Sequence, residues 1–184
     1  MQEISQDMLV KAASGDLVAF EEVYKATSSF VYNIAYRVVN NREDAMEVAQ
    51  EVYMTVYDKL KTFRFESSFK TWIYRITANS AINYAKKASR YKAVPFEESY
   101  GEISIESDAH LKMQEEERSK LVEDLLKELN VDQRACVVLR DIQGLSYDEI
   151  ATSLGVNINT VRTRLKRARE KLVRIRKQVN YEKV

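Results

Sequence analysis

Cysteine, histidine and proline each occur once in these 184 residues, and glycine only four times. A single cysteine excludes an internal disulfide and is typical of a reducing compartment. One histidine and one cysteine cannot assemble a Cys/His zinc site, and they leave few options for a His-based catalytic triad. The shortage of glycine and proline argues against a turn-rich barrel or sandwich and favours a mostly helical chain.

Long apolar runs are also missing. None approaches the roughly 18 residues that a membrane helix requires, and no signal-peptide pattern opens the chain. We therefore expect no membrane insertion and a cytoplasmic location. The composition, 45% apolar and 31% charged, is that of a folded globular protein. We expect no cofactor and no metal ion.

The net charge of +1 conceals an uneven distribution of charge along the chain. Residues 59–92 carry nine basic residues against one acid, and residues 156–184 carry ten against two. The segments before each of these blocks are acidic. Basic residues often do no more than solubilise exposed helices, so the charge alone leaves open whether these blocks bind an anionic partner.

Helical periodicity dominates, and no strong strand signal competes with it. Apolar stripes predict helices over 16–39, from 43 to about 60 and from about 67 to 87. Residues 89–110, which hold the only proline and many glutamates, indicate an acidic linker.

The periodicity returns over 111–129, and Asp132 can cap a further helix that runs to about Asp141, before Gly144. The predicted fold is therefore all-α, with two small helical domains joined by an acidic linker. We expect the first domain over 1–90, the linker over 91–115 and the second domain over 116–184.

A helix-turn-helix pattern lies near the C-terminus. Ser146 and Glu149 have the spacing of a capping box, Gly155 can supply the turn, and Asn157 or Asn159 can cap the second helix. That second helix is apolar on one side, along Val161, Leu165, Ala168, Leu172 and Ile175.

The opposite side of this helix is polar and basic. Long donors beside short polar groups are what a helix in the DNA major groove requires, whereas the simpler interpretation is a solvated surface helix. The capping box, the glycine and the basic face together favour DNA reading. The candidate DNA-contacting residues are Asn159, Arg162, Thr163, Lys166 and Arg167.

The stretch 63–75 interleaves aromatic and basic residues, and two asparagines follow on the same helix. Aromatic rings stack on unpaired bases, amides contact base edges and cations hold phosphates. The alternative is that Trp72, which we expect to be exposed, and the phenylalanines simply form the core of a small domain. Beside a second DNA-reading element, the nucleic-acid interpretation is favoured. Its candidate residues are Phe63, Arg64, Phe69, Lys70, Trp72, Arg75, Asn79 and Asn83.

An acidic face is predicted opposite the apolar stripe of the helix that starts near residue 43. By default such a face is solvated, but in a DNA-binding protein it is free for a basic protein partner. The candidate partner-binding residues are Asp44, Glu47, Gln50, Glu51 and Met54.

Three motifs in this order resemble the extracytoplasmic-function (ECF) sigma factors of the sigma-70 family. Residues 44–53 resemble the family's polymerase-binding helix, 63–83 its segment that melts and reads the −10 element, and 145–169 its helix-turn-helix that reads the −35 element. One departure is Phe65, because a small residue, often glycine, usually follows the Phe-Arg pair in the family.

The resemblance implies an alternative sigma factor that binds core RNA polymerase and catalyses nothing itself. The first domain would be sigma region 2 and the second sigma region 4. The expected partners are the β′ clamp helices and the β flap of core polymerase, promoter DNA and an anti-sigma factor.

Three other classes of function stay open on the residues alone. A helix-turn-helix regulator that binds duplex DNA without polymerase would explain 145–177 but neither of the other motifs. A nucleic-acid enzyme would need a carboxylate metal cluster or a nucleophile that the sequence does not display. A pure interaction module would lack a steep dependence of DNA affinity on salt.

Overall fold

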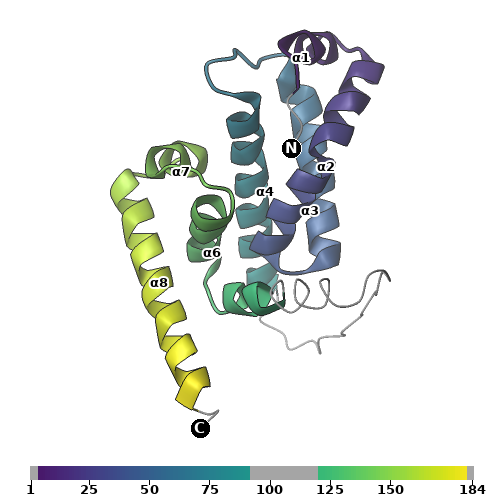
Figure 1. Ribbon diagram of the computed structural model, residues 1–184. Coiled ribbons are helices and arrows are strands. Elements are labelled where there is room, and N and C mark those ends of the chain that lie inside the picture. The colour runs from purple at the N-terminus through teal and green to yellow at the C-terminus, as the bar shows by residue number, and fades with distance from the viewer. Residues whose placement is uncertain (1–3, 92–119, 182–184) are drawn as a thin grey trace, which may run out of the picture.

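The computed structural model describes residues 4–91 and 120–181, and every regular element within these two ranges is helical (Figure 1). The predicted all-α fold is confirmed. The predicted linker, apart from Tyr91, lies outside the described residues. In chain order the elements are α1 (Gln6–Ala13), α2 (Leu17–Val39), α3 (Arg42–Leu60), α4 (Phe69–Tyr91), a helical stretch over 120–127, α6 (Val131–Val137), the π-helical η1 (Val138–Ile142), α7 (Tyr147–Leu154) and α8 (Ile158–Tyr181).

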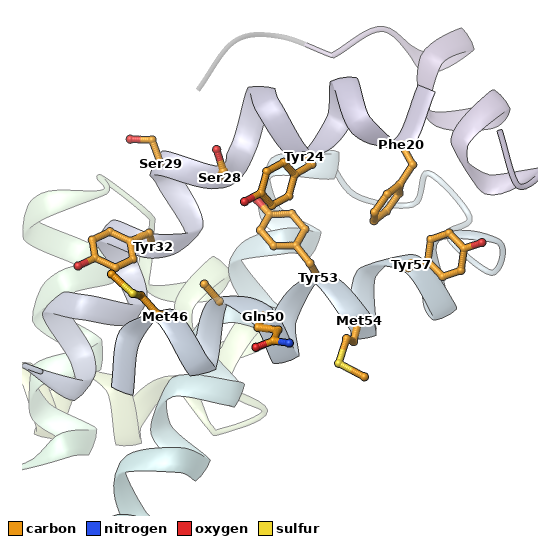
Figure 2. Close-up of a pocket in the computed structure, with 11 residues that line it drawn as sticks. Phe20, Tyr24, Ser28, Ser29, Tyr32, Met46, Gln50, Tyr53, Met54 and Tyr57 are labelled. Carbon is orange, nitrogen blue, oxygen red and sulfur yellow. The ribbon is translucent and has the colours of Figure 1, made fainter. Parts of the chain in front are cut away.

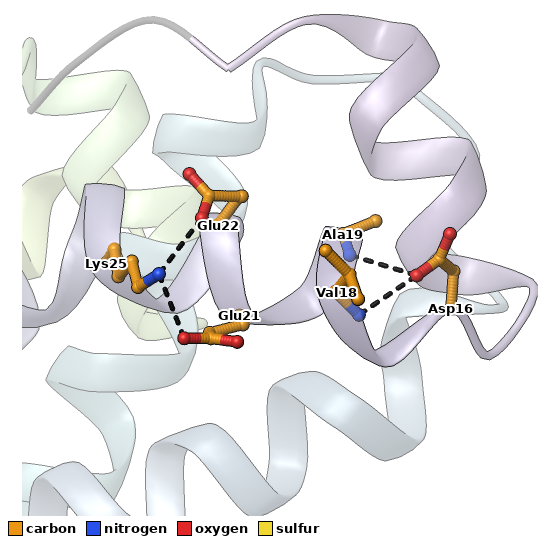
Figure 3. Close-up of polar contacts among 6 residues, drawn as sticks. All are labelled: Asp16, Val18, Ala19, Glu21, Glu22 and Lys25. Atoms are coloured by element: carbon orange, nitrogen blue, oxygen red, sulfur yellow. Dashed lines mark hydrogen bonds and ion pairs between the residues drawn. The ribbon is translucent and has the colours of Figure 1, made fainter.

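The start of α2 is fixed by a side-chain cap. The Asp16 carboxylate accepts hydrogen bonds from the backbone N–H groups of Val18 and Ala19, at 2.9 and 3.1 Å (Figure 3). These two groups are among the first N–H donors that a helix leaves without a partner, and a carboxylate there also suits the positive end of the helix dipole. Further along α2, Lys25 pairs with two exposed glutamates at 2.9 and 3.1 Å, contacts that contribute little to stability.

Two asparagines separate α2 from α3, where the sequence predicted a break. Asn40 ends α2 in the left-handed conformation, with φ of 60°. The side chain of Asn41 then caps α3 by accepting a hydrogen bond from the N–H of Asp44 at 2.9 Å. Asparagine tolerates left-handed backbone and caps helices well, so both positions suit the residue.

The first half of the chain is a bundle of α2, α3 and α4, with α1 packed against one end of α2 and α3 (Figure 1). The short helix α1 was not predicted from the sequence; Ser5 caps it, and Leu9 and Ala12 are its buried residues. The predicted apolar stripe of α3 forms its buried side at Ala45, Val48, Val52, Val56 and Leu60, whereas Ala49, the remaining predicted member, is only partly buried.

Helix α6 begins two residues earlier than the sequence predicted. Asn130, not Asp132, caps α6, through a reciprocal capping box with Gln133. The Asp132 carboxylate lies in the first turn and pairs instead with Lys86 at 2.9 Å and Arg164 at 3.3 Å. The prediction failed because both residues are good caps, and only Asn130 has a capping-box partner three residues later.

The two halves pack against each other, with α4 lying beside α6 and α7 (Figure 1). Ile34, Tyr74 and Ala78 from the first half belong to the same buried cluster as Leu126 and Leu139 from the second. The Tyr74 ring meets Phe30 edge-on, with centroids 4.6 Å apart, and its hydroxyl donates to the Gln143 side-chain oxygen at 2.9 Å.

Arg134 adds a polar link between the halves. Its guanidinium donates to the carbonyl oxygen of Val38, in the last turn of α2, and to that of Leu129, both at 3.0 Å. The last carbonyls of a helix lack partners inside the helix, and a cation suits the negative end of the helix dipole. Burial lowers the pKa of Arg134. The described residues thus form one packed body.

Candidate nucleic-acid and partner interfaces

The helix-turn-helix forms as the sequence predicted. The Ser146 hydroxyl accepts from the Glu149 N–H at 3.2 Å, and the Glu149 carboxylate accepts from the Ser146 N–H at 2.7 Å. Gly155 ends α7 in the left-handed conformation, with φ of 63°. The side chain of Asn157 accepts from the N–H of Asn159 at 2.8 Å, so Asn157 is the cap of α8. Ile150, Val161, Leu165 and Ala168 are the buried residues that fix α7 against α8.

The outward side of α8 carries all five candidate −35 residues, and each is exposed. Asn159 organises this face, because its side-chain oxygen accepts from Arg162 at 3.0 Å and its backbone oxygen accepts from Thr163 at 2.8 Å. Two other arginines of α8 turn elsewhere: Arg164 pairs with Asp132, and Arg169 pairs with Asp141 at 2.9 Å. The exposed face therefore combines an oriented guanidinium, an amide, a hydroxyl and further cations.

The aromatic residues at the start of α4 form one cluster. The Phe63 ring lies 4.7 Å from Phe65, 5.1 Å from Trp72 and 6.0 Å from Phe69, measured between centroids. Phe69 is buried and Trp72 is partly buried, so the expectation of an exposed Trp72 was wrong. The indole is covered because the 61–68 connection folds back over the first turn of α4, a contact that helical periodicity cannot show. Arg64 and Lys70 are exposed beside the cluster.

Further along α4, only some of the candidate DNA-contacting residues are exposed. Arg75 and Asn83 are exposed. Asn79 is not free, because its side-chain amide donates to the backbone oxygen of Ser153 in α7 at 2.8 Å, and also to the Arg75 carbonyl at 2.8 Å. The structure therefore places Asn79 in the contact between the two halves.

The candidate partner-binding residues of α3 lie on two sides of that helix. Asp44 and Glu47 face α4, where both carboxylates are within hydrogen-bond distance of the Tyr84 hydroxyl, at 3.0 and 2.7 Å. Both contacts raise the pKa of Tyr84, because a nearby carboxylate stabilises the protonated phenol, and the hydrogen bond to Glu47 has the largest effect. Glu51 is exposed on the same side.

Gln50 and Met54 belong instead to the lining of a groove of about 750 Å³ between α2 and α3 (Figure 2). The groove is rich in aromatic and methionine side chains. Tyr24 meets Tyr53 with centroids 4.6 Å apart, and burial raises the pKa of Tyr53 to about 12. The lining residues are Phe20, Tyr24, Ser28, Ser29, Tyr32, Met46, Ala49, Gln50, Tyr53, Met54 and Tyr57.

Sequence reasoning missed this groove. Its signal is a second stripe on each helix at spacings of three and four residues, such as Met46, Gln50, Tyr53 and Tyr57 on α3. The stripe includes polar and exposed residues, so it differs little from an ordinary helix flank until α2 is placed beside it.

Within 4–91 and 120–181, no group of histidine, cysteine, aspartate and glutamate residues is arranged to hold a metal ion. No helix in the same ranges is long and apolar enough to cross a membrane. Cys136 is fully buried, and burial raises the pKa of its thiol to about 11.

Each half of the chain matches a model of a known protein family. The family model of sigma-70 region 2 matches residues 23–91, and that of sigma-70 region 4 matches residues 119–172. The chain is 32% identical over 178 residues to the RNA polymerase sigma-H factor of Pseudomonas aeruginosa, an alignment that covers 92% of each chain. It is 33% identical over 166 residues to the ECF RNA polymerase sigma factor SigE of Mycolicibacterium smegmatis, covering 87% of this chain and 63% of the length of SigE.

Among solved structures, the sigma factor RpoE of Bartonella quintana, in a co-crystal with the anti-sigma factor NepR, has the same fold, with a TM-score of 0.65 at 22% identity. That comparison covers 86% of this chain and 96% of that one. The chain belongs to the sigma-70 family. Its similarity to the ECF members over most of its length makes it an alternative sigma factor, which directs promoter-specific transcription initiation.

Proposed function

We propose that the chain reads the two promoter elements and docks on polymerase through three separate surfaces. The observation that carries this proposal is the exposed face of α8, where Asn159, Arg162 and Thr163 are held together by hydrogen bonds on a capped helix-turn-helix. Arginine and asparagine have the donor geometry for base edges of the major groove, and Lys166 and Arg167 extend the same face with cations. This face reads the −35 duplex.

The second surface is the aromatic and basic start of α4, which reads the melted −10 strand. The cluster around Phe63 offers rings for stacking, and Arg64, Lys70 and Arg75 are exposed cations that can follow the phosphates. Asn83 is exposed further along the same helix and contacts a base edge.

The third surface is α3, which docks on core polymerase. Its acidic side, with Glu47 and Glu51, complements a basic partner such as the β′ clamp helices. The neighbouring α2–α3 groove supplies the apolar contact area that an acidic face lacks, since Gln50 and Met54 belong to its lining. The same surfaces are where an anti-sigma factor would exclude polymerase, as the partnership of the Bartonella relative suggests.

Asn79 can contact DNA only after α4 separates from α7, because its amide is engaged by Ser153. The packed arrangement is therefore the free form, and promoter binding on polymerase requires the halves to part. The chain itself catalyses nothing in this scheme, and RNA synthesis belongs to polymerase in the cytoplasm.

The direct test is transcription from a library of randomised promoter fragments by core bacterial polymerase, with and without this protein. We expect transcripts from a defined subset of fragments only when the protein is present. If the protein retains duplex DNA but never directs transcription, it is a regulator that binds DNA without polymerase, and the proposal fails.

A further inference from the structure

Phe65 has a backbone conformation that its side chain disfavours. Its φ is 56°, and the only other non-glycine residue with positive φ among residues 4–91 and 120–181 is Asn40, a helix-ending asparagine. In the left-handed region the Cβ atom crowds the following carbonyl oxygen, so a bulky residue there is a true outlier. Strain of this kind persists where the surrounding structure imposes it, and it clusters at ligand-binding sites.

Burial of the ring does not account for the strained backbone. The Phe65 side chain is 41% exposed, and phenylalanine is ordinarily among the most buried residue types. The ring instead contacts Phe63 in a tilted arrangement, with centroids 4.7 Å apart and planes at 54°, while a large part of the residue stays open to solvent.

The Phe63 ring, which Phe65 contacts, is itself packed against residues of the core. Phe63 contacts Trp72 and Phe69, at 5.1 and 6.0 Å between centroids, and Phe69 is only 8% exposed, in the core of the first half. Phe65 is therefore the outermost ring of an aromatic cluster whose innermost ring, Phe69, is buried in the core. A fixed ring loses little entropy when a flat ligand stacks on it.

The charges around the ring favour a polyanion. Lys61, Arg64 and Lys70 are exposed on the same connection and on the first turn of α4, against the single acid Glu66. An exposed aromatic ring beside cations is the arrangement with which proteins bind single-stranded nucleic acid, because every base has a face that can stack.

We propose that Phe65 is a base-stacking residue: the exposed part of its ring receives one unpaired base of the melted promoter strand. This inference rests on the proposed reading of the −10 element and assigns a DNA contact to a residue that replaces the family's usual small one. The strained backbone is what aims the ring outward.

The test uses holoenzyme reconstituted from the full chain and core polymerase. Its probe is a fork-shaped promoter DNA taken from the transcribed subset, with an unpaired −10 strand. An abasic nucleotide replaces each unpaired position in turn, and affinity is measured for wild type and for Phe65→Asn. Asparagine accepts the left-handed backbone and keeps a Cβ atom but has no ring.

We expect one position at which loss of the base weakens wild-type binding by about 5- to 150-fold, the range for one aromatic stack. Phe65→Asn should weaken binding to intact DNA by a similar factor, and combining the two changes should cost no more than either alone. Phe65→Tyr, which keeps the ring, should bind like wild type.

Phe65→Gly provides a second ringless variant with relaxed backbone, and thermal unfolding together with polymerase affinity verifies the folding of both. If one position is sensitive to base loss and the ringless variants lose nothing, another residue stacks there and the inference is overturned. If no position is sensitive at all, the reading of the −10 strand fails, and this inference fails with it.

Discussion

Tyr74→Phe tests whether the packing of the two halves controls access to DNA. The substitution removes only the hydroxyl that donates to Gln143 across the interface at 2.9 Å and keeps the ring against Phe30. Tyr74 is 2% exposed, and burial raises its pKa to about 12, so the hydroxyl stays a neutral donor throughout the usual pH range.

A neutral hydrogen bond contributes about 0.5–1.5 kcal/mol, so its loss should raise the ratio of open to closed molecules by about 2- to 12-fold. Gln143 is only partly buried, and water can satisfy its side-chain oxygen in the variant. We therefore expect the ratio of open to closed molecules to change by a factor near the lower end of this range. The contacts of Asn79 and Arg134 remain and keep much of the population closed.

Labels on cysteines introduced at the exposed positions Asp58 and Arg174 report the separation of the halves by energy transfer. The native Cys136 is fully buried and stays a thiol, so it does not compete for the labels. The matched control is Tyr24→Phe, which removes a hydroxyl on the α2–α3 groove, away from the interface.

Tyr74→Phe should increase the open fraction, and the affinity of the free chain for the unpaired −10 strand should rise by the same factor, because only open molecules expose Asn79. Tyr24→Phe should change neither. The reasoning is refuted if Tyr74→Phe opens the halves without any gain in affinity, or if its energy transfer and DNA binding both match those of wild type.

Three further predictions concern single side chains. Ser146→Ala removes a helix cap worth about 1 kcal/mol and should lower the unfolding midpoint by roughly 2–4 °C. The Ser146 backbone and hydroxyl hold the pKa of Glu149 below its usual range. This carboxylate therefore stabilises the fold above its unfolded pKa and stops doing so as pH falls through the lower folded pKa. The stability difference between wild type and variant should shrink in acid, and a difference that stays the same throughout an acid scan would contradict this. Arg162→Ala should cost about 1–3 kcal/mol of binding to the preferred −35 duplex and relax one base position, whereas Lys166→Ala should weaken all duplexes alike, as titrations against a set of mutated duplexes will show. Tyr84→Phe keeps the ring but removes the hydroxyl that holds the Asp44 and Glu47 carboxylates in place, so these acids lose their fixed orientation and we expect weaker binding to core polymerase at low salt; equal affinities for wild type and variant would remove Tyr84 from the docking surface.

Local patterns in the sequence predicted much of the helical framework. The stripe from Ala45 to Leu60 follows from helical periodicity, and the caps at Ser146, Gly155 and Asn157 follow from the backbone needs of helix ends. Each of these depends on residues within a few positions of one another. The exposed face of α8 could be predicted for the same reason.

Contacts between distant segments could not be predicted in this way. Tyr74 and Gln143 are 69 residues apart, and Asn79 and Ser153 are 74 apart, so no periodicity links them. The covered Trp72 and the α2–α3 groove depend likewise on how separate elements meet. Helix α1 escaped notice because eight residues give little periodicity to detect.

The central claim is that this chain, when bound to polymerase, reads two promoter elements through two separate surfaces of its own, on α8 and on α4. It is tested most directly by selecting transcribed fragments from a randomised library with core polymerase and wild type, Arg162→Ala or Asn83→Ala. We predict that Arg162→Ala relaxes the selected sequence only in the upstream element, and Asn83→Ala only in the downstream element. The account is contradicted if both variants relax the same element, or if neither changes the selected sequences.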